Sequence, residues 1–315
     1  MSTSYPNNIL RSVIDLKSAT ATEIYSLFEA ALKLKKDFSA HKDIPQKGIA
    51  ALLFFEPSTR TRFSFEAACA RSGVHPLVLS GSAGTSLEKD ETLEDTILNI
   101  EAMKPLFFVI RSPDTLDMRQ MAESIHTPII NAGWGKQGHP TQALLDMLTV
   151  FEKFNGVEGK KILFVGDIKH SRVVSSHLEL AKVLGYKIGY ACPANFLPST
   201  VGRDVMYFSQ LKEGLQWADA VVALRVQKER HIKSGSGADG TAFSVDNYKK
   251  QFSINNTTLE DFRSDGLLLH PGPINYGVEL EKEVLQDSRS QILKLVENGA
   301  FVREALIRQV LQGIS

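Results

Sequence analysis

Two arginines, one serine and two threonines occupy the five consecutive positions 58 to 62, within the segment FFEPSTRTRF. All five side chains donate hydrogen bonds, and the two guanidinium groups stay positively charged at any physiological pH. Such a cluster suits an oxyanion that must be held from several directions. The simpler interpretation is an exposed turn whose charges are solvated, so the surrounding sequence has to decide.

The polar cluster lies between a predicted strand and a predicted helix. The apolar run IAALLFF (49–55) predicts a strand, after which Phe63, Ala67 and Ala70 recur at helical spacing and Gly73 is a stop signal. Open α/β sheets bind ligands at the carboxyl ends of their strands, and helix N-termini offer free N–H groups to anions. The turn matches neither GxxxxGK[ST] nor GxGxxG, and the lone glycine of VGDIKHSR makes no dinucleotide fingerprint, which disfavours a dehydrogenase.

The whole chain alternates short apolar runs with stretches of helical period, which indicates an α/β fold. Continuous apolar runs are typical of parallel strands that are buried on both faces. In DETLEDTILNIEAMK, one stripe of a predicted helix consists of Leu93, Thr96, Ile97 and Ile100. The other predicted strands are 76–80, 106–110, 128–132, 161–166, 187–192, 220–224 and 267–270.

The predicted strands form two groups, separated by a helix. Four strands come before residue 140 and four after residue 160, and HPTQALLDMLTVFEKFNG between them predicts a connecting helix that ends at Asn155-Gly156. We therefore expect two similarly sized domains, each a parallel sheet with helices on both faces. The expected bounds are 1–145, 146–290 and, for a C-terminal helix that packs back on the first domain, 291–315.

The overall composition is that of a globular protein without a charge bias. Of the 315 residues, 43% are hydrophobic and 23% are charged, and 36 basic residues balance 36 acidic ones. No net field therefore favours nucleic acid or anionic lipid, and any anion site has to be local. Cys69 and Cys192 form no CxxC or metal-like pair, so they are expected to be core residues in a reducing compartment. The start lacks a signal-peptide pattern and the apolar runs are too short to span a bilayer, so we expect a cytoplasmic protein.

Five sequence blocks, in order along the chain, resemble the aspartate/ornithine carbamoyltransferase family. FFEPSTRTRFSFE and HPTQALLD are similar to blocks of the whole family, while VGDIKHSRV (165–173), LRVQKER (224–230) and LHPGPINYGVE (269–279) are similar to its aspartate-specific members. The resemblance extends from about residue 10 to the C-terminal helix. An ornithine-specific member is expected to carry cysteine instead of the glycine of HPGP and a different segment instead of RVQKER.

The resemblance implies transfer of the carbamoyl group from carbamoyl phosphate to the amine of L-aspartate in pyrimidine biosynthesis, without a metal or organic cofactor. A neutral amine attacks the carbonyl carbon, and the resulting tetrahedral oxyanion expels phosphate. The protein has to hold two reactants together and stabilise charge on oxygen. Two alternatives stay open: a transferase for another amine, such as ornithine or an acylated ornithine, and a non-catalytic scaffold subunit. The complete set of ligand residues argues against the scaffold.

The resemblance assigns carbamoyl phosphate mainly to the first domain. It implies that Arg111 bridges the phosphate and the carbonyl oxygen, and that Thr61 and His139 help to polarise the carbonyl. Gln142 and the backbone carbonyls of 271–273 would receive the carbamoyl NH₂ group. Taken alone, Arg111 would be a surface arginine at a strand end, and the dipeptide His-Pro would be structural. The implied carbamoyl phosphate ligands are Ser58, Thr59, Arg60, Thr61, Ser86, Arg111, His139, Gln142, Pro271, Gly272 and Pro273, and the implied catalytic residues are Arg60, Thr61, Lys89, Arg111 and His139.

The second domain is expected to bind the aspartate. Two guanidinium forks and an amide suit a dicarboxylate, although RVQKER alone could also be a solvated, charged helix start. Asp167 is expected to support these groups, because a free carboxylate beside an acidic substrate would repel it. The Gly- and Ser-rich KSGSGADGT (233–241) predicts a mobile loop. The implied aspartate ligands are Lys89, Arg172, Arg225 and Gln227.

The segment SLEKDET (86–92) resembles a family loop whose Ser86 and Lys89 reach into the neighbouring subunit's site, which implies a homotrimer with shared sites. Three positions depart from the family pattern: Asp90 stands where glycine is usual, Trp134 where an acidic residue is common, and Tyr276 where arginine is usual. Asp90 puts a carboxylate beside a lysine that is meant to contact two anionic substrates. The sequence leaves open whether a regulatory chain or a dihydroorotase binds the trimer.

Overall fold

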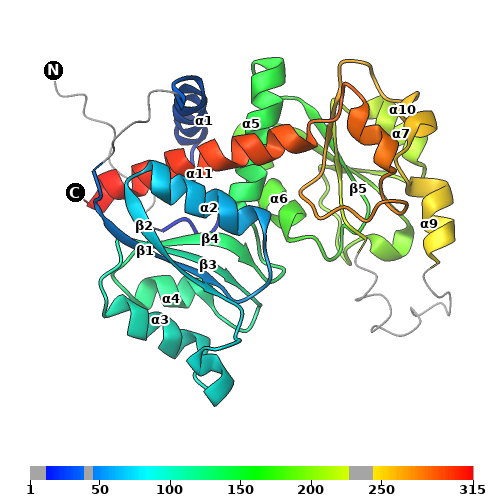
Figure 1. The fold of residues 1–315 in the computed structure, drawn as a ribbon. Helices are drawn as coiled ribbons and strands as arrows, with labels where there is room; N and C mark the ends of the chain where they lie inside the picture. The colour runs from blue at the N-terminus through cyan, green and yellow to red at the C-terminus, as the bar shows by residue number, and fades with distance from the viewer. Residues whose placement is uncertain (1–11, 39–44, 227–243, 315) are drawn as a thin grey trace. The chain divides into compact units, whose positions relative to one another are not determined.

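The computed structural model describes residues 12–38, 45–226 and 244–314 of the 315-residue chain (Figure 1). Contacts divide the chain into two compact units, each with its own sheet. The first unit comprises Met1–Leu148, Ser175–Val183 and Val296–Ser315, and the second comprises Thr149–Val174 and Leu184–Leu295.

A four-stranded parallel sheet forms the centre of the first unit. Its strands are β1 (Gly48–Phe54), β2 (Val74–Ser80), β3 (Phe108–Ser112) and β4 (Ile129–Trp134), in the order β2-β1-β3-β4. β1 lies between two neighbours, so that Leu52 pairs with Val78 of β2 on one side and with Val109 of β3 on the other. All four strands were predicted from the apolar runs, with ends that differ by a residue or two.

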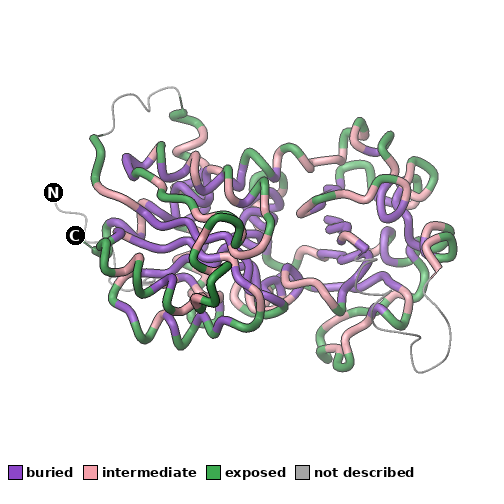
Figure 2. Tube along the Cα trace, turned by 60° about the horizontal axis from the view of Figure 1, so that its bottom comes forward, coloured by how far each residue is buried: buried purple, intermediate pink, exposed green. Residues whose placement is uncertain are grey.

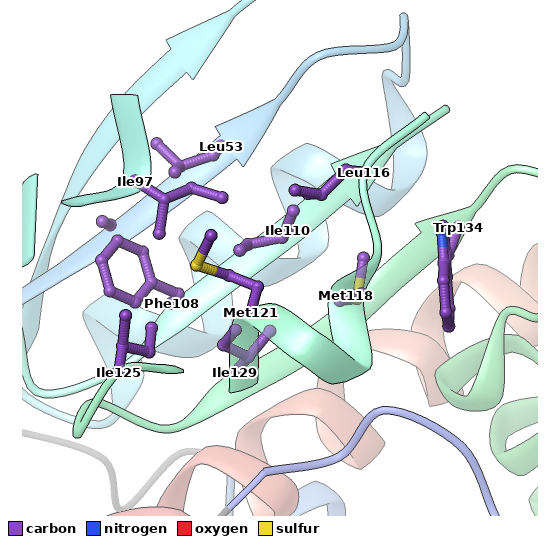
Figure 3. Packing of buried hydrophobic residues seen from close by; sticks show 11 residues of the cluster. Leu53, Ile97, Phe108, Ile110, Leu116, Met118, Met121, Ile125, Ile129 and Trp134 are labelled. Carbon is purple, nitrogen blue, oxygen red and sulfur yellow. The ribbon is translucent and has the colours of Figure 1, made fainter. Parts of the chain in front are cut away.

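Helices lie on both faces of this sheet. The helical elements of the unit are α1 (Ala21–Lys36), α2 (Arg60–Arg71), α3 (Leu93–Glu101), α4 (Met118–Ser124), the 3-10 helix η2 (Ser86–Lys89) and, in part, α5 (Pro140–Phe154) and α11 (Ile292–Ile314). In Figure 1, α3 and α4 lie on one side of the sheet and α2 and α11 on the other. Leu53, Ile97, Phe108, Ile110 and Met121 are buried together on the side of α3 and α4 (Figure 3).

The buried face of α2, the helix that follows β1, differs from the face predicted by the spacing of its apolar residues. α2 ends at Arg71, and Gly73 adopts a φ of +72°, as expected of a helix stop. Phe63, however, is 54% exposed, whereas the buried residues of α2 include the polar Thr61 and Ser64. The spacing of Phe63, Ala67 and Ala70 therefore predicts the helix correctly but not its inner face, because hydroxyl groups on that face contact other buried polar residues.

The second unit contains a five-stranded parallel sheet. Its strands are β5 (Lys161–Val165), β6 (Lys187–Ala191), β7 (Val205–Phe208), β8 (Ala220–Ala223) and β9 (Leu267–Leu269), in the order β7-β6-β5-β8-β9. The sequence predicts all of these except β7. That strand lies at the edge of the sheet, and Met206 and Tyr207 in its middle are 51% and 40% exposed. Its four residues VMYF form an apolar run as long as the run AVVA of β8, so the missed strand did have a sequence signal, although its side chains are not buried on both faces.

The helical elements of the second unit are mostly short. They are α6 (Arg172–Leu184, shared with the first unit), η3 (Ala194–Phe196), α7 (Leu211–Trp217), α9 (Val245–Phe252), α10 (Asn256–Leu259) and η4 (Lys282–Gln286). Figure 2 shows that much of the two sheets is buried while many connecting turns are exposed, and the edge strands β2 and β7 are the least buried strands. The predicted fold class, α/β with two similarly sized parallel-sheet domains, is confirmed.

The two cysteines are core residues, as predicted. Cys69 of α2 and Cys192 after β6 are fully buried, and neither forms a disulfide. Burial raises the pKa of each thiol to about 12, which leaves them unreactive. Among the described residues, none of the helices has the length and apolar character needed to cross a membrane.

Each sheet has one point at which the strand order reverses. From β1 the chain goes to β2 on one side and then to β3 on the other, and from β5 it goes to β6 on one side and later to β8 on the other. Ligands of open α/β sheets bind at the carboxyl ends of the two strands that flank such a point. The topology therefore predicts ligand sites at the segments after β1 and β3 in the first unit and after β5 and β8 in the second.

Candidate active site

The segment after β1 forms a turn that leads into the N-terminus of α2. Thr59, the N-cap residue, makes no side-chain capping hydrogen bond, and the first turn of α2 contains no acidic residue. Thr61 is buried, Ser58 is half-buried, and Thr59 and Arg60 are exposed. A helix N-terminus that is not closed by a capping side chain or a carboxylate can direct its N–H groups and its dipole at an anion.

Arg111 lies directly beside this turn, on β3. Its backbone pairs with Phe54, the last residue of β1, and its carbonyl accepts a hydrogen bond from the Phe55 N–H at 2.9 Å. The Arg111 Nε lies 3.7 Å from the Glu56 Oε2, and the Arg111 side chain is 15% exposed. Arg111 thus contacts the segment that leads into the turn 58–61, at the reversal point of the first sheet. Glu56, which forms an ion pair with the guanidinium, was not predicted as a site residue although it lies within the same segment FFEPST.

His139 and Gln142 lie where the chain passes from β4 into α5. Pro140 is the first residue of this helix, a position that suits proline because no backbone N–H is needed there. His139 and Gln142 are only 5% and 7% exposed. The His139 N–H donates to the Ser176 Oγ at 2.8 Å, so α6 fixes the backbone of this segment. As predicted, α5 ends at Phe154 before Asn155-Gly156.

A group of fully buried polar residues supports the starts of α2 and α5. Arg303 of α11 donates to the Ser64 Oγ at 2.6 Å and to the Thr141 Oγ1 at 3.3 Å. Burial lowers the pKa of the Arg303 guanidinium, while the negative charge of Asp146 acts in the opposite direction. The sequence analysis missed these residues. The available signal was the pair Arg303-Glu304 within the apolar repeat FVREALI of a helix.

The loop with Ser86 and Lys89 lies after β2 and is exposed. Both residues belong to η2, whose N-cap Thr85 accepts a hydrogen bond from the Leu87 N–H at 3.3 Å. Asp90 ends this helix with φ 63° and ψ 18°, a left-handed conformation that favours glycine. The replacement of the usual glycine by Asp90 therefore costs backbone strain, in addition to placing a carboxylate next to Lys89.

Trp134, another departure from the family pattern, is almost fully buried at the end of β4. Its ring lies under the Arg119 guanidinium, with 5.1 Å between the guanidinium carbon and the ring centroid. Arg119 in turn donates from Nε and from a terminal nitrogen to the Asp15 carboxylate, at 3.1 and 2.8 Å. Trp134 therefore has a structural explanation: it packs in the core of the first unit and carries a cation on its face.

In the second unit, Arg172 follows β5 as the first residue of α6 and is half-buried. Between them, Gly166 has a φ of +122°, and a Cβ there would lie 2.6 Å from the Leu224 carbonyl oxygen. Only glycine allows the ends of β5 and β8 to approach this closely. The buried Asp167 contacts His170 Nδ1 at 2.8 Å.

One buried carboxylate joins the segments that follow β8 and β9. Glu279, which is fully buried, accepts from the Asn275 N–H at 2.6 Å with one oxygen and from the Val226 N–H at 3.4 Å with the other. Asn275 also donates to the Val226 carbonyl at 3.0 Å. Glu279 therefore ties the segment after β9 to Val226, the residue that follows Arg225.

The turn 271–273 itself is held by His270. The Gly272 N–H donates to the His270 Nδ1 at 2.7 Å, and the His270 Nε2 lies 3.4 Å from the Glu279 Oε1. The Gly272-Pro273 peptide bond is cis, and Pro273 is exposed. Gln227 and the loop 233–241 lie outside the described residues. Among the residues that are described, no three histidine, cysteine or acidic side chains gather so that they could hold a metal ion.

Comparison with known proteins gives the same answer for both halves of the chain. The family model described as aspartate/ornithine carbamoyltransferase, carbamoyl-P binding domain, matches residues 11–152. The model described as aspartate/ornithine carbamoyltransferase, Asp/Orn binding domain, matches residues 158–310.

Individual relatives match over nearly their whole length. The chain is 38% identical to an aspartate carbamoyltransferase catalytic subunit of Campylobacter jejuni, over 96% of this chain and 98% of that one. It is also 38% identical to the corresponding subunit of Gemmatimonas aurantiaca, over 94% and 92%.

Solved structures are similar in fold. Aspartate transcarbamoylase from Trypanosoma cruzi in complex with carbamoyl phosphate and aspartate has a TM-score of 0.80 at 28% identity, over 94% of this chain and 95% of that one. Ornithine carbamoyltransferase from Thermus thermophilus also has a TM-score of 0.80, at 25% identity, over 96% and 100%.

Proposed function

Because the chain belongs to the aspartate/ornithine carbamoyltransferase family, we infer that it transfers the carbamoyl group of carbamoyl phosphate to the amine of L-aspartate. The products are N-carbamoyl-L-aspartate and phosphate, and the reaction belongs to pyrimidine biosynthesis. The observation that carries this function is the match, over both units, to catalytic subunits that use aspartate.

We propose that the first unit binds carbamoyl phosphate. The phosphate would lie at the N-terminus of α2 and accept hydrogen bonds from Ser58, Thr59, Arg60 and Thr61. The uncapped start of this helix supports the proposal, as does the position of Arg111 next to the turn. In the reaction the amine nitrogen forms a bond to the carbonyl carbon, the bond from that carbon to the phosphate oxygen breaks, and the amine proton leaves with the phosphate.

The charge that develops on the carbonyl oxygen needs fixed donors. Arg111, Thr61 and His139 are proposed for this role, and their backbones are held by β3, α2 and Ser176 respectively. Donors that need not reorganise during the reaction stabilise a transition state more than the ground state. Gln142 and the carbonyls of Pro271, Gly272 and Pro273 are proposed to accept hydrogen bonds from the carbamoyl NH₂.

The second unit is proposed to supply aspartate ligands. Arg172 and Arg225 follow β5 and β8, the two strands at the reversal point of the second sheet, which supports an assignment of both guanidinium groups to one ligand. Gln227 and Lys89 complete the proposed set. Two guanidinium forks recognise a dicarboxylate by bidentate hydrogen bonds, and neither would favour the side-chain amine of ornithine.

The proposed working assembly is a homotrimer in which Ser86 and Lys89 complete the site of a neighbouring subunit. The exposure of both residues on η2 supports this proposal. A cytoplasmic location is also proposed, on the basis of two buried thiols that form no disulfide.

The function is tested with radiolabelled carbamoyl phosphate and a panel of amines that includes L-aspartate, L-ornithine and N-acetyl-L-ornithine. We expect labelled N-carbamoyl-L-aspartate and no labelled citrulline. Turnover of ornithine at a rate comparable to that of aspartate would contradict the assignment, and a lack of turnover with every amine would favour the scaffold interpretation.

A further inference from the structure

The amide of Gln142 has a defined orientation because of one contact inside α5. Its Nε2 donates to the Asp146 Oδ1 at 2.9 Å, and both side chains are buried. The two residues are one helical turn apart, at positions whose side chains meet on the same face of a helix. A carboxylate accepts hydrogen bonds, so it selects the NH₂ end of the amide and leaves the carbonyl oxygen Oε1 as the end directed away from it.

Asp146 is itself held from a second side. Its other oxygen, Oδ2, lies 3.2 Å from the His177 Nε2, and the side chains of Asp146 and His177 are 1% and 0% exposed. Burial lowers the pKa of Arg303, and the negative charge of Asp146 partly opposes that shift by stabilising the cation. A carboxylate with a partner on each oxygen and a nearby buried cation is fixed in rotation, and solvent does not compete for it.

We infer that Asp146 is a positioning residue for carbamoyl transfer: it holds Gln142 so that the amide oxygen is presented to the NH₂ group of carbamoyl phosphate. The inference rests on the proposed function, which assigns this substrate group to Gln142. In the opposite orientation the amide NH₂ of Gln142 would face the NH₂ of the substrate. Two donors would then oppose each other, and one hydrogen bond would be lost.

The same site would distinguish carbamoyl phosphate from acetyl phosphate, in which a methyl group replaces the NH₂. A site built to hydrogen-bond an NH group rejects an analogue that lacks it, because the acceptor is then left unpaired in a buried place. Inorganic phosphate lacks the whole acyl group, so its affinity depends on the phosphate site at the turn 58–61 and not on Gln142. Comparing the affinities for these three ligands therefore distinguishes a change in the orientation of Gln142 from damage to the phosphate site.

A purely structural role for Asp146 makes a different prediction. If the carboxylate only balances the charge of Arg303, its removal lowers the melting temperature and weakens all three ligands alike. If it positions Gln142, its removal lowers the preference for carbamoyl phosphate over acetyl phosphate and leaves the affinity for phosphate nearly unchanged.

The test measures dissociation constants of the three ligands by calorimetry, in the absence of any amine, for the wild-type protein and for Asp146→Ala. We expect the ratio of the acetyl phosphate constant to the carbamoyl phosphate constant to fall roughly tenfold in Asp146→Ala, the effect of about one hydrogen bond. Gln142→Leu should lose the same preference. The double variant should lose no more than either single variant, because Asp146 acts through Gln142.

Glu304→Gln is the matched control, because Glu304 is a fully buried carboxylate of α11 whose Oε1 accepts from Arg308 at 2.8 Å. It should lower the melting temperature and leave the ratio unchanged. If Asp146→Ala does not fold, the apolar replacement Asp146→Leu/His177→Leu removes both polar side chains while it fills their volume.

A folded Asp146 variant with the wild-type ratio, or with an equal loss of affinity for all three ligands, would overturn the inference. Failure of the proposed function is distinguishable, because in that case the wild-type protein itself would not prefer carbamoyl phosphate.

Discussion

In the first unit the proposed ligands Ser58 to Thr61, His139 and Gln142 stand at the starts of two helices, whereas in the second unit Arg225 and residues 271–273 stand in turns between elements. The helix starts are fixed from beneath by Arg303, which donates to Ser64 and to Thr141, residues 239 and 162 positions away in the sequence. The turns are fixed by Glu279, which accepts from a residue only 53 positions away and from one four positions away.

The difference corresponds to two chemical tasks. Charge develops on the carbonyl oxygen during the reaction, and donors for that charge must be held rigidly, as buried helix starts can hold them. Aspartate keeps its two negative charges throughout, so its ligands have to recognise more than they have to catalyse. We therefore expect damage to the first unit to reduce kcat, and damage to the second unit to raise the KM for aspartate.

The largest effect is expected from Arg111→Ala, which removes a proposed oxyanion donor of the first unit. The value of kcat should fall roughly 10²- to 10³-fold, about 3–4 kcal/mol. Steady-state kinetics with both substrates measure this, and a melting curve serves as the folding control. A kcat near the wild-type value would mean that another group polarises the carbonyl.

The second prediction tests whether Lys89 of one subunit completes the active site of a neighbouring subunit. Arg111→Ala and Lys89→Ala should each be nearly inactive, because every site then lacks one cation. When the two are unfolded together in equal amounts and refolded into rings, roughly a quarter of the sites combine an intact Arg111 with an intact Lys89 from a neighbour. Activity should rise towards about a quarter of the wild-type value. Refolded trimers, confirmed by mass, that stay inactive would refute a shared site.

The third effect concerns the second unit. Glu279→Ala unties the turn 271–273 from the segment that carries Arg225, so the KM for aspartate should rise roughly tenfold, as for the loss of one charged hydrogen bond. We expect a smaller change in kcat than for Arg111→Ala. Asp287→Ala is the matched control, because it removes a carboxylate of the same unit that pairs with Arg289 at 2.6 Å. Equal effects of both variants on the KM would show that general destabilisation is the cause.

The smallest effect is expected at Asp90, in the exposed loop of the first unit. Asp90→Gly removes the strain of a left-handed φ and should stabilise the fold by about 1 kcal/mol, which corresponds to a rise of a few degrees in melting temperature. Because a carboxylate beside Lys89 is also removed, the KM for carbamoyl phosphate should fall. Asn155→Gly, at a φ of 52° after α5, changes the same backbone property elsewhere and should leave that KM unchanged.

Strand ends and the residues directly after them were predictable from the sequence, since apolar runs mark buried parallel strands and the chemistry lies at their carboxyl ends. Ser58 to Thr61 were proposed in this way, whereas Arg111 was proposed through the family resemblance. His177 and Arg303 were not predictable, because each acts through contacts with residues that only the tertiary structure brings close. Asp146 and Glu279 each have one partner four residues away, but their second partners, His177 and Val226, are distant in the sequence. β7 was missed although its residues VMYF form an apolar run of the same length as the run AVVA of β8.

The long-range support of Arg303 has a consequence for the order in which the protein can mature on the ribosome. The segments with Ser64 and Thr141 are synthesised before the whole of the second unit, and Arg303 is synthesised after it. Until α11 has emerged, the nascent first unit contains the carboxylate of Asp146 without the buried cation that balances it. The first unit therefore cannot reach its final packing cotranslationally as an independent N-terminal domain, which is the usual route for a chain with two domains. A ribosome stalled within the second unit should display a first unit that is more sensitive to protease than the same residues in the finished protein.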